Sequence, residues 1–111
     1  MSKYADIIER LEKVTGPDSD LDLDIANLLD PPVARHSLLH QPVTASLEAS
    51  VALVKRMLPS ALCIVKHGFT PSAMIWFLEQ DKDECPEYRG ATYSIALLIA
   101  LFRAMEAQND R

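Results

Sequence analysis

Apolar residues recur at helical spacing in two segments near the start of the chain. Residues 4–14 place Tyr, Ile, Leu and Val side chains on one side of a predicted helix, and charged side chains on the other. The Thr-Gly-Pro sequence at 15–17 is expected to end this helix, because proline cannot continue the hydrogen-bond ladder. A second helix is predicted from Ser19 to Asp30, with its aspartates in the first turns, where carboxylates favour the positive end of the helix dipole.

The next segment, residues 31–43, contains three prolines and no sustained period, so it is predicted to be a loop with at most one short edge strand at 37–40. Thr44 is the expected N-cap of a third helix that ends before Pro59. Its apolar face is predicted to comprise Leu47, Val51, Val54 and Leu58.

The pattern then changes to that of strands. Residues 61–67 and 72–80 are short, apolar and separated by a turn containing Gly68 and Pro71, which predicts an antiparallel hairpin. Trp76 falls on the same face as Met74. Because both faces of the hairpin are largely apolar, we expect both to be covered, by helices on two sides or by a partner subunit.

A polar loop is predicted over residues 81–90, and Thr92 is the expected cap of a last helix from Tyr93 to about residue 108. The first ten residues of that helix are apolar nearly all round, which is typical of a helix in the middle of a fold. The expected class is therefore α+β, one domain over residues 1–111, in the order α-α-α-β-β-α with a possible third strand.

Charge and composition restrict the classes of partner. The 111 residues include 11 Lys and Arg against 16 Asp and Glu, a formal charge of -5, which argues against DNA binding and against coating an anionic membrane surface. The longest apolar run, 95–102, is too short to cross a bilayer, and the charged first 13 residues do not have the pattern of a signal peptide. With only two cysteines, no disulfide framework is expected, and we predict a cytoplasmic protein.

Two patterns invite a metal-binding interpretation. Alternating aspartates at 18, 20, 22 and 24 resemble a calcium loop, but Leu23 and Leu29 stand where that loop needs glycine and a bidentate glutamate, so an acidic helix start is favoured. His36 and His40 are four apart among prolines, and surface histidines are favoured there over a metal site that would recruit His67 or Cys85. We therefore expect no metal or cofactor.

Catalytic groups are not evident either. Cys63 lies in an apolar run and Cys85 among carboxylates, so neither resembles a nucleophile. We expect a protein that is not an enzyme, the residual alternative being a metal-dependent hydrolase that uses His36, His40 and a carboxylate.

Five residues remain as candidates for ligand binding. Trp76 is expected in the core, with a stacking surface for a base or an interface anchor as the alternative. Arg35 and Arg89 lie in predicted loops and are able to clamp a phosphate, although solvated surface positions are the default. Backbone amides near Thr44 and Thr92 are further phosphate donors, and Tyr93 is a second aromatic for stacking.

Three stretches resemble conserved blocks of small phage and prophage proteins described as a phage αβα-sandwich domain. They are IIERLEKVTGPDSDLDLDIANLL, PVTASLEASVALVKRMLP and RGATYSIALLIALFRAMEAQ, in that order, and they cover roughly half of the chain. The chain departs from this pattern at Tyr93, where the family usually has proline, and in a shorter segment before Thr44. The resemblance implies a small helix-and-sheet fold of viral origin and no general activity.

These observations favour a viral accessory protein that acts by binding in the host cytoplasm. The leading hypothesis is a counter-defence protein that sequesters a host immune nucleotide signal. The alternatives are an acidic inhibitor that docks on a host defence protein, steered by its carboxylates, and a structural phage component. A homo-oligomer is expected, with Trp76 and the hairpin edge at or near the subunit interface.

Overall fold

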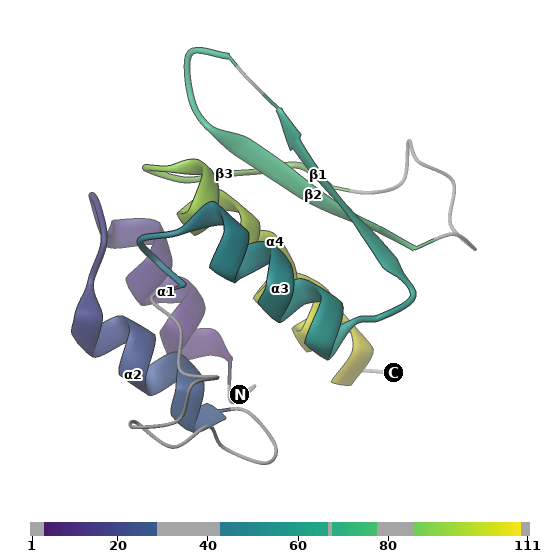
Figure 1. Cartoon of the computed structure of the whole chain (residues 1–111), viewed down its shortest axis with the longest axis horizontal. Helices are drawn as coiled ribbons and strands as arrows, with labels where there is room; N and C mark the ends of the chain where they lie inside the picture. The colour runs from purple at the N-terminus through teal and green to yellow at the C-terminus, as the bar shows by residue number, and fades with distance from the viewer. Residues whose placement is uncertain (1–3, 29–42, 67, 78–85, 110–111) are drawn as a thin grey trace.

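The computed structural model describes residues 4–28, 43–66, 68–77 and 86–109, and the fold is α+β as predicted (Figure 1). Its elements in chain order are α1 (Ala5–Lys13), α2 (Ser19–Leu28), α3 (Leu47–Met57), β1 (Ala61–Lys66), β2 (Ser72–Phe77), β3 (Tyr88–Arg89) and α4 (Tyr93–Asn109). The predicted strand at 37–40 lies outside the described residues.

Helix α4 occupies the centre of the molecule, as its pattern predicts. It packs against β2 on one side and against α1 and α3 on the others (Figure 1). Ile95, Leu98 and Phe102 are fully buried, and the Phe102 ring lies 5.7 Å from the ring of Tyr4 in a tilted arrangement. Residues 94–102 of this helix are buried on every side and need no polar face, which explains the uninterrupted apolar run.

The sheet is antiparallel with strand order β1-β2-β3. The first two strands form the predicted hairpin, with a continuous register from Ala61 opposite Phe77 to Lys66 opposite Ser72. The third strand falls in the segment predicted to be a polar loop, and this prediction was wrong for Tyr88 and Arg89. Gly90, directly after β3, donates its N–H to the carbonyl of Pro71 at 3.1 Å, which holds this short strand beside the hairpin.

All described helices lie on one side of the sheet (Figure 1). Of the two kinds of cover expected for the hairpin, helices on both sides are not seen among the described residues, and cover by a partner subunit stays a prediction. Alternate residues divide between the two faces, and those that pack against the core are Ala61, Cys63, Val65, Ala73, Ile75, Phe77 and Tyr88.

The third helix begins two residues later than predicted. Its N-cap is Ser46, which has an extended backbone and whose Oγ accepts the N–H of Ala49 at 3.2 Å. Thr44 is only 1% exposed and is engaged elsewhere, because its Oγ1 accepts the N–H of Asp18 at 2.9 Å and its own N–H donates to the buried carboxylate of Asp22 at 2.8 Å. A tertiary contact thus removes Thr44 from the capping role.

The predicted apolar face of α3 is confirmed for Val54 and Leu58, which are buried, and for Val51, which packs against the core, and it is wrong for Leu47. The residues enclosed there are Ala49, Ser50, Leu53 and Val54, whereas Leu47 is 37% exposed. Ser50 is tolerated inside because its hydroxyl donates to the carbonyl of Ser46 at 3.0 Å.

Candidate functional site

The structure brings two of the five predicted binding residues onto one surface. Ser72, Met74 and Trp76 alternate on the side of β2 that faces away from the core, and Arg89 pairs with Ser72 across β2 and β3. Arg35 lies outside the described residues. Thr92 and Tyr93 are at the start of α4, so they do not belong to the same strand surface.

We define the outer face as the sheet surface opposite the helices. By register it carries Leu62, Ile64, Lys66, Ser72, Met74, Trp76, Glu87 and Arg89. Leu62 pairs with Trp76 and Ile64 pairs with Met74, which makes one end of this face apolar. Lys66, Ser72 and Arg89 form the other end, next to the hairpin turn.

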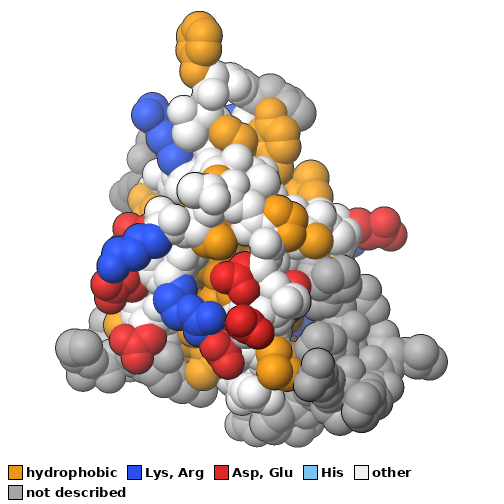
Figure 2. Space-filling model, turned by 90° about the vertical axis from the view of Figure 1, so that its left-hand side faces the viewer, with side chains coloured by type: hydrophobic (Ala, Val, Ile, Leu, Met, Phe, Trp, Pro, Cys, Tyr) orange, Lys and Arg blue, Asp and Glu red, His pale blue; other side chains and the backbone are white. Residues whose placement is uncertain are grey.

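The apolar end of the outer face is accessible to solvent in part, because Met74 is only 5% exposed there. Leu62 is 46% exposed, and Ile64 and Trp76 are partly exposed, although no described helix packs on them. Phe69, in the hairpin turn, is fully exposed. Figure 2 shows hydrophobic atoms protruding at the top of the molecule, above the charged lower part. Phe69 belongs to the turn at the polar end, so the exposed apolar set of the outer face is limited to Leu62 with the partly exposed Ile64 and Trp76. Exposed apolar side chains that lie together are typical of interaction surfaces.

The polar end combines two cations and one carboxylate. The Lys66 Nζ donates to Glu87 Oε2 at 2.9 Å. Hydrogen bonds from Lys66 and Ser72 hold the pKa of the Glu87 carboxyl below its ordinary value, so Glu87 is an anion at neutral pH. Arg89 is exposed beside this pair. The Glu87 carboxylate therefore neutralises Lys66, and Arg89 supplies the excess positive charge at this end.

At the start of α4, the predicted cap is confirmed. Thr92 Oγ1 accepts the N–H of Ile95 at 3.2 Å, so its side chain already satisfies one of the free amides of the first turn. Tyr93 is partly buried as the first helical residue. The cap contact involves only the Thr92 hydroxyl, so phosphate binding by backbone amides near Thr92 and stacking on Tyr93 stay predictions.

A groove of about 220 Å³ lies between α1 and α4. Its charged lining consists of Glu9, Glu12, Arg103 and Glu106. These groups pair with one another or with neighbours, since Arg103 contacts Glu12 at 2.7 Å and Glu106 at 3.8 Å, and Glu9 pairs with Lys13 at 2.7 Å. The groove is thus a surface ion-pair network in which three carboxylates share two cations, and every one of its charged groups has an ion-pair partner.

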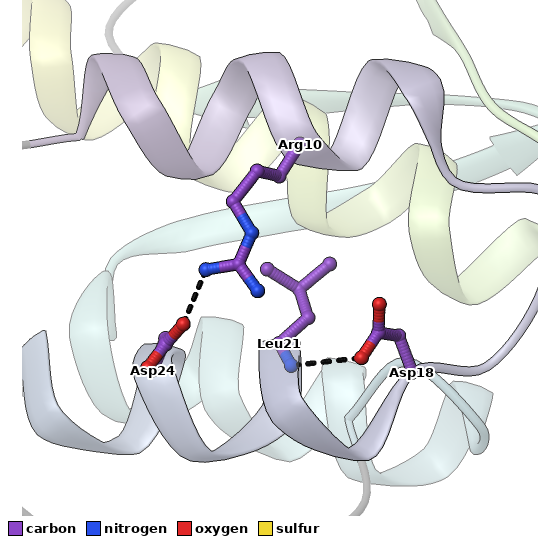
Figure 3. Close-up of polar contacts among 4 residues, drawn as sticks. All are labelled: Arg10, Asp18, Leu21 and Asp24. Atoms are coloured by element: carbon purple, nitrogen blue, oxygen red, sulfur yellow. Dashed lines mark hydrogen bonds and ion pairs between the residues drawn. The ribbon is translucent and has the colours of Figure 1, made fainter.

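Three of the four aspartates at 18–24 have structural roles, as the acidic-helix interpretation predicts. Asp18 Oδ1 accepts the N–H of Leu21 at 3.1 Å and so caps α2, while Asp24 pairs with Arg10 of α1 (Figure 3). Acidic and basic side chains are interleaved over the lower part of the face in Figure 2. The ion pair between Arg10 and Asp24 joins α1 to α2.

Other candidate chemistry is limited within the described residues. No group of three or more His, Cys, Asp or Glu side chains is arranged to hold a metal, and no helix is long and apolar enough to cross a membrane, for the part of the chain that the structure describes. Burial raises the pKa of the Cys63 thiol, which keeps it protonated. His36, His40, His67 and Cys85 lie outside the described residues.

The sequence reasoning missed Lys66 and Glu87. Lys66 closes an apolar strand and Glu87 sits in a polar segment 21 residues away, so only the hairpin register brings them together. The sequence did contain a signal for the face on which they lie, because the alternation along 72–76 assigned Met74 and Trp76 to one face of the hairpin.

No protein-family model matches the chain, and searches of curated proteins and of solved structures find no match either. The function is therefore inferred from the geometry of the outer face.

Proposed function

We propose that the protein acts by binding an anionic nucleotide on the outer face of its sheet, without chemistry of its own. The observation that carries the proposal is the shared position of Trp76 and Arg89 on this face. Trp76 lies four residues along β2 from Ser72, about 13 Å at roughly 3.3 Å per residue, and Arg89 is the cross-strand neighbour of Ser72.

The apolar end is suited to a base. An indole stacks on any nucleobase, and such stacking contributes about 1–3 kcal/mol per base. Leu62 is the cross-strand neighbour of Trp76 and is 46% exposed, so a stacked base is bordered by one further apolar side chain, whereas Met74 is buried. The net negative charge of the protein, -5, does not oppose stacking, because stacking does not depend on the ligand's phosphates.

The polar end is suited to a phosphate. Arg89 is the exposed cation, and its planar guanidinium matches a phosphate in a bidentate arrangement. Lys66 is held by Glu87 and becomes a second phosphate donor only when that ion pair opens. Glu87 therefore reduces the positive charge of the site by neutralising Lys66. Its carboxylate repels a phosphate that lies near Glu87 and does not contact Arg89.

The biological role we propose is sequestration of a host immune nucleotide signal by a phage-encoded protein in the host cytoplasm. The viral setting comes from the resemblance of three sequence blocks to small phage proteins. Sequestration needs tight binding and no turnover, which suits a site that has a stacking ring and cations and lacks an evident nucleophile.

Isothermal titration calorimetry with cyclic dinucleotides and NAD-derived nucleotides tests the proposal. We expect saturable binding by wild type, a loss of about tenfold to a hundredfold for Arg89→Ala, and a comparable loss for Trp76→Ala. Arg10→Ala is the matched control, because it removes the same charge from a solvent-exposed ion pair on α1. Binding of none of these nucleotides, or equal losses in Arg10→Ala and Arg89→Ala, contradicts the proposal.

One observation favours a second candidate, an acidic inhibitor of a host defence protein. Described carboxylates are concentrated on α1 and α2, remote from the outer face (Figure 1). Such a surface steers association toward a basic channel. A pull-down that captures a host nucleic-acid-binding protein tests this candidate. If the capture is lost at high salt and on charge reversal of Asp20, and no nucleotide binds, the second candidate is selected over the first.

A further inference from the structure

Strand β1 is an open edge of the sheet. The strand order β1-β2-β3 leaves one side of β1 without a paired strand among the described residues. None of its six residues is fully buried, whereas the first four residues of β2 are. Its core-facing residues Ala61, Cys63 and Val65 are only partly buried, so the helices do not close over this edge.

This edge lacks the features that usually prevent strand pairing. Natural sheets protect edges with proline, inward charges, bulges or very short strands. The register of β1 with β2 is continuous over all six residues, without a bulge, and residues 61–65 contain neither proline nor a charged side chain. Lys66, at the end of the strand, is the one charged residue of β1.

We propose that two copies of this chain pair through β1 in an antiparallel arrangement with its two-fold axis at Cys63. Cross-strand neighbours must share a face, and odd-numbered β1 residues face the core while even-numbered ones lie on the outer face. The axis at Cys63 sets Leu62 opposite the partner's Ile64, and Ala61 opposite the partner's Val65. Every apolar residue of the strand then has an apolar neighbour, and Lys66 faces the partner's Ser60.

Two-fold registers centred one residue away are poorer. An axis at Leu62 sets only residues 61–63 of the two strands opposite each other. Moving the axis to Ile64 also conserves the faces, but it places Leu62 opposite the charged Lys66 of the partner subunit. Self-complementarity of the strand therefore specifies both the occupant of the edge, a second copy, and the register.

The pairing extends the outer face. Three strands from each copy form one continuous six-stranded sheet, with both Trp76 residues on the same surface. The dimer does not depend on the proposed nucleotide. Experiments can therefore refute nucleotide binding without refuting pairing through β1, and the reverse.

The molar mass in solution, measured by light scattering at micromolar concentration without nucleotide, tests the pairing. We expect twice the 12.4 kDa chain mass for wild type and the chain mass for Ile64→Lys. Trp76→Ala is the control, because it alters the outer face on the inner strand β2 and should remain dimeric. A monomeric wild type, or dissociation by Trp76→Ala with a dimeric Ile64→Lys, overturns the proposal.

Single-cysteine cross-linking tests the register and does not depend on whether Ile64→Lys folds. In Cys85→Ser protein, the two Cys63 residues lie opposite each other, at the Cα separation of about 4.5–5.5 Å that a disulfide spans. Copper–phenanthroline with oxygen, which accepts the thiol hydrogens, should yield a linked dimer. Ile64→Cys in a Cys63→Ser, Cys85→Ser background should yield none. Linkage at 64 and not at 63 overturns the proposed register, and linkage at neither position overturns the pairing.

Discussion

Gly90 is the residue at which a single methyl group should disturb both the fold and the proposed site. A Cβ built there would lie 2.6 Å from the backbone N of Ala96, 2.9 Å from its Cα and 3.1 Å from the carbonyl carbon of Ile95. Favourable carbon contacts lie at roughly 3.5–4.0 Å. All three obstructing atoms are backbone of a buried helix, so no rotamer change relieves the overlap, and β3 must move away from α4.

The cost of Gly90→Ala follows from these contacts. Overpacking of this kind costs about 1–3 kcal/mol, and the displacement also weakens the hydrogen bond from Gly90 to Pro71, which contributes about 0.5–1.5 kcal/mol. Reduced freedom of the unfolded chain offsets about 0.4–1 kcal/mol. We expect a net destabilisation of about 1–3 kcal/mol, with weaker nucleotide binding because Arg89 precedes the displaced residue.

Urea unfolding of Gly90→Ala beside Gly68→Ala checks this reasoning. Gly68 is a matched control, because a Cβ there meets nothing within 4 Å and its backbone is not left-handed. Gly68→Ala should be neutral or stabilising by up to about 1 kcal/mol. If Gly90→Ala unfolds at the wild-type urea concentration, the close packing of β3 on α4 is not a constraint and the argument fails.

Three further outcomes are expected. Phe102→Ala should cost about 3–5 kcal/mol in chemical denaturation, because the side chain is fully buried at the centre of the core. Ser46→Ala should cost about 0.5–2 kcal/mol through loss of the α3 cap, with exposed Ser60→Ala as an inert control. Because Lys66 lowers the pKa of Glu87 in the folded state, this carboxylate stabilises the fold above its ordinary pKa of 4.5, and the contribution is lost as pH falls through the lowered value. The melting-temperature difference between wild type and Glu87→Gln should therefore shrink on acidification, and a constant difference contradicts the ion pair.

Local sequence patterns were sufficient for the elements whose stability is local. The apolar run of α4 predicted its central position, and the turn residues between 67 and 71 predicted the hairpin. Thr92 was identified as a cap because a hydroxyl at a helix start has one near partner.

Features set by long-range contacts were not predictable in this way. Tyr88 and Arg89 form a strand because Gly90 donates a hydrogen bond to Pro71 and packs on α4. The polar residues around them carry no sequence pattern that predicts this contact. Thr44 was predicted to be a helix cap, but its backbone N–H donates to the carboxylate of Asp22, 22 residues away. The pairing of Lys66 with Glu87 likewise depends on the hairpin register.

The outer face is also where local reasoning was least informative. Alternation along β2 assigned Trp76 to a face, but it did not show that the described helices would all lie on the opposite side. That arrangement depends on how α3 and α4 pack together, which no single segment encodes.

The fluorescence of Trp76, the only tryptophan in the chain, tests the central claim most directly, because it reports from the outer face itself. Titration with cyclic dinucleotides and NAD-derived nucleotides should give a saturable change in emission for at least one of them. The same titration should need about ten to a hundred times more of that nucleotide in Arg89→Ala, and several-fold less in Glu87→Gln, where Lys66 is released. An emission spectrum that stays constant with every one of these nucleotides, or one whose midpoint is the same in all three proteins, contradicts the account.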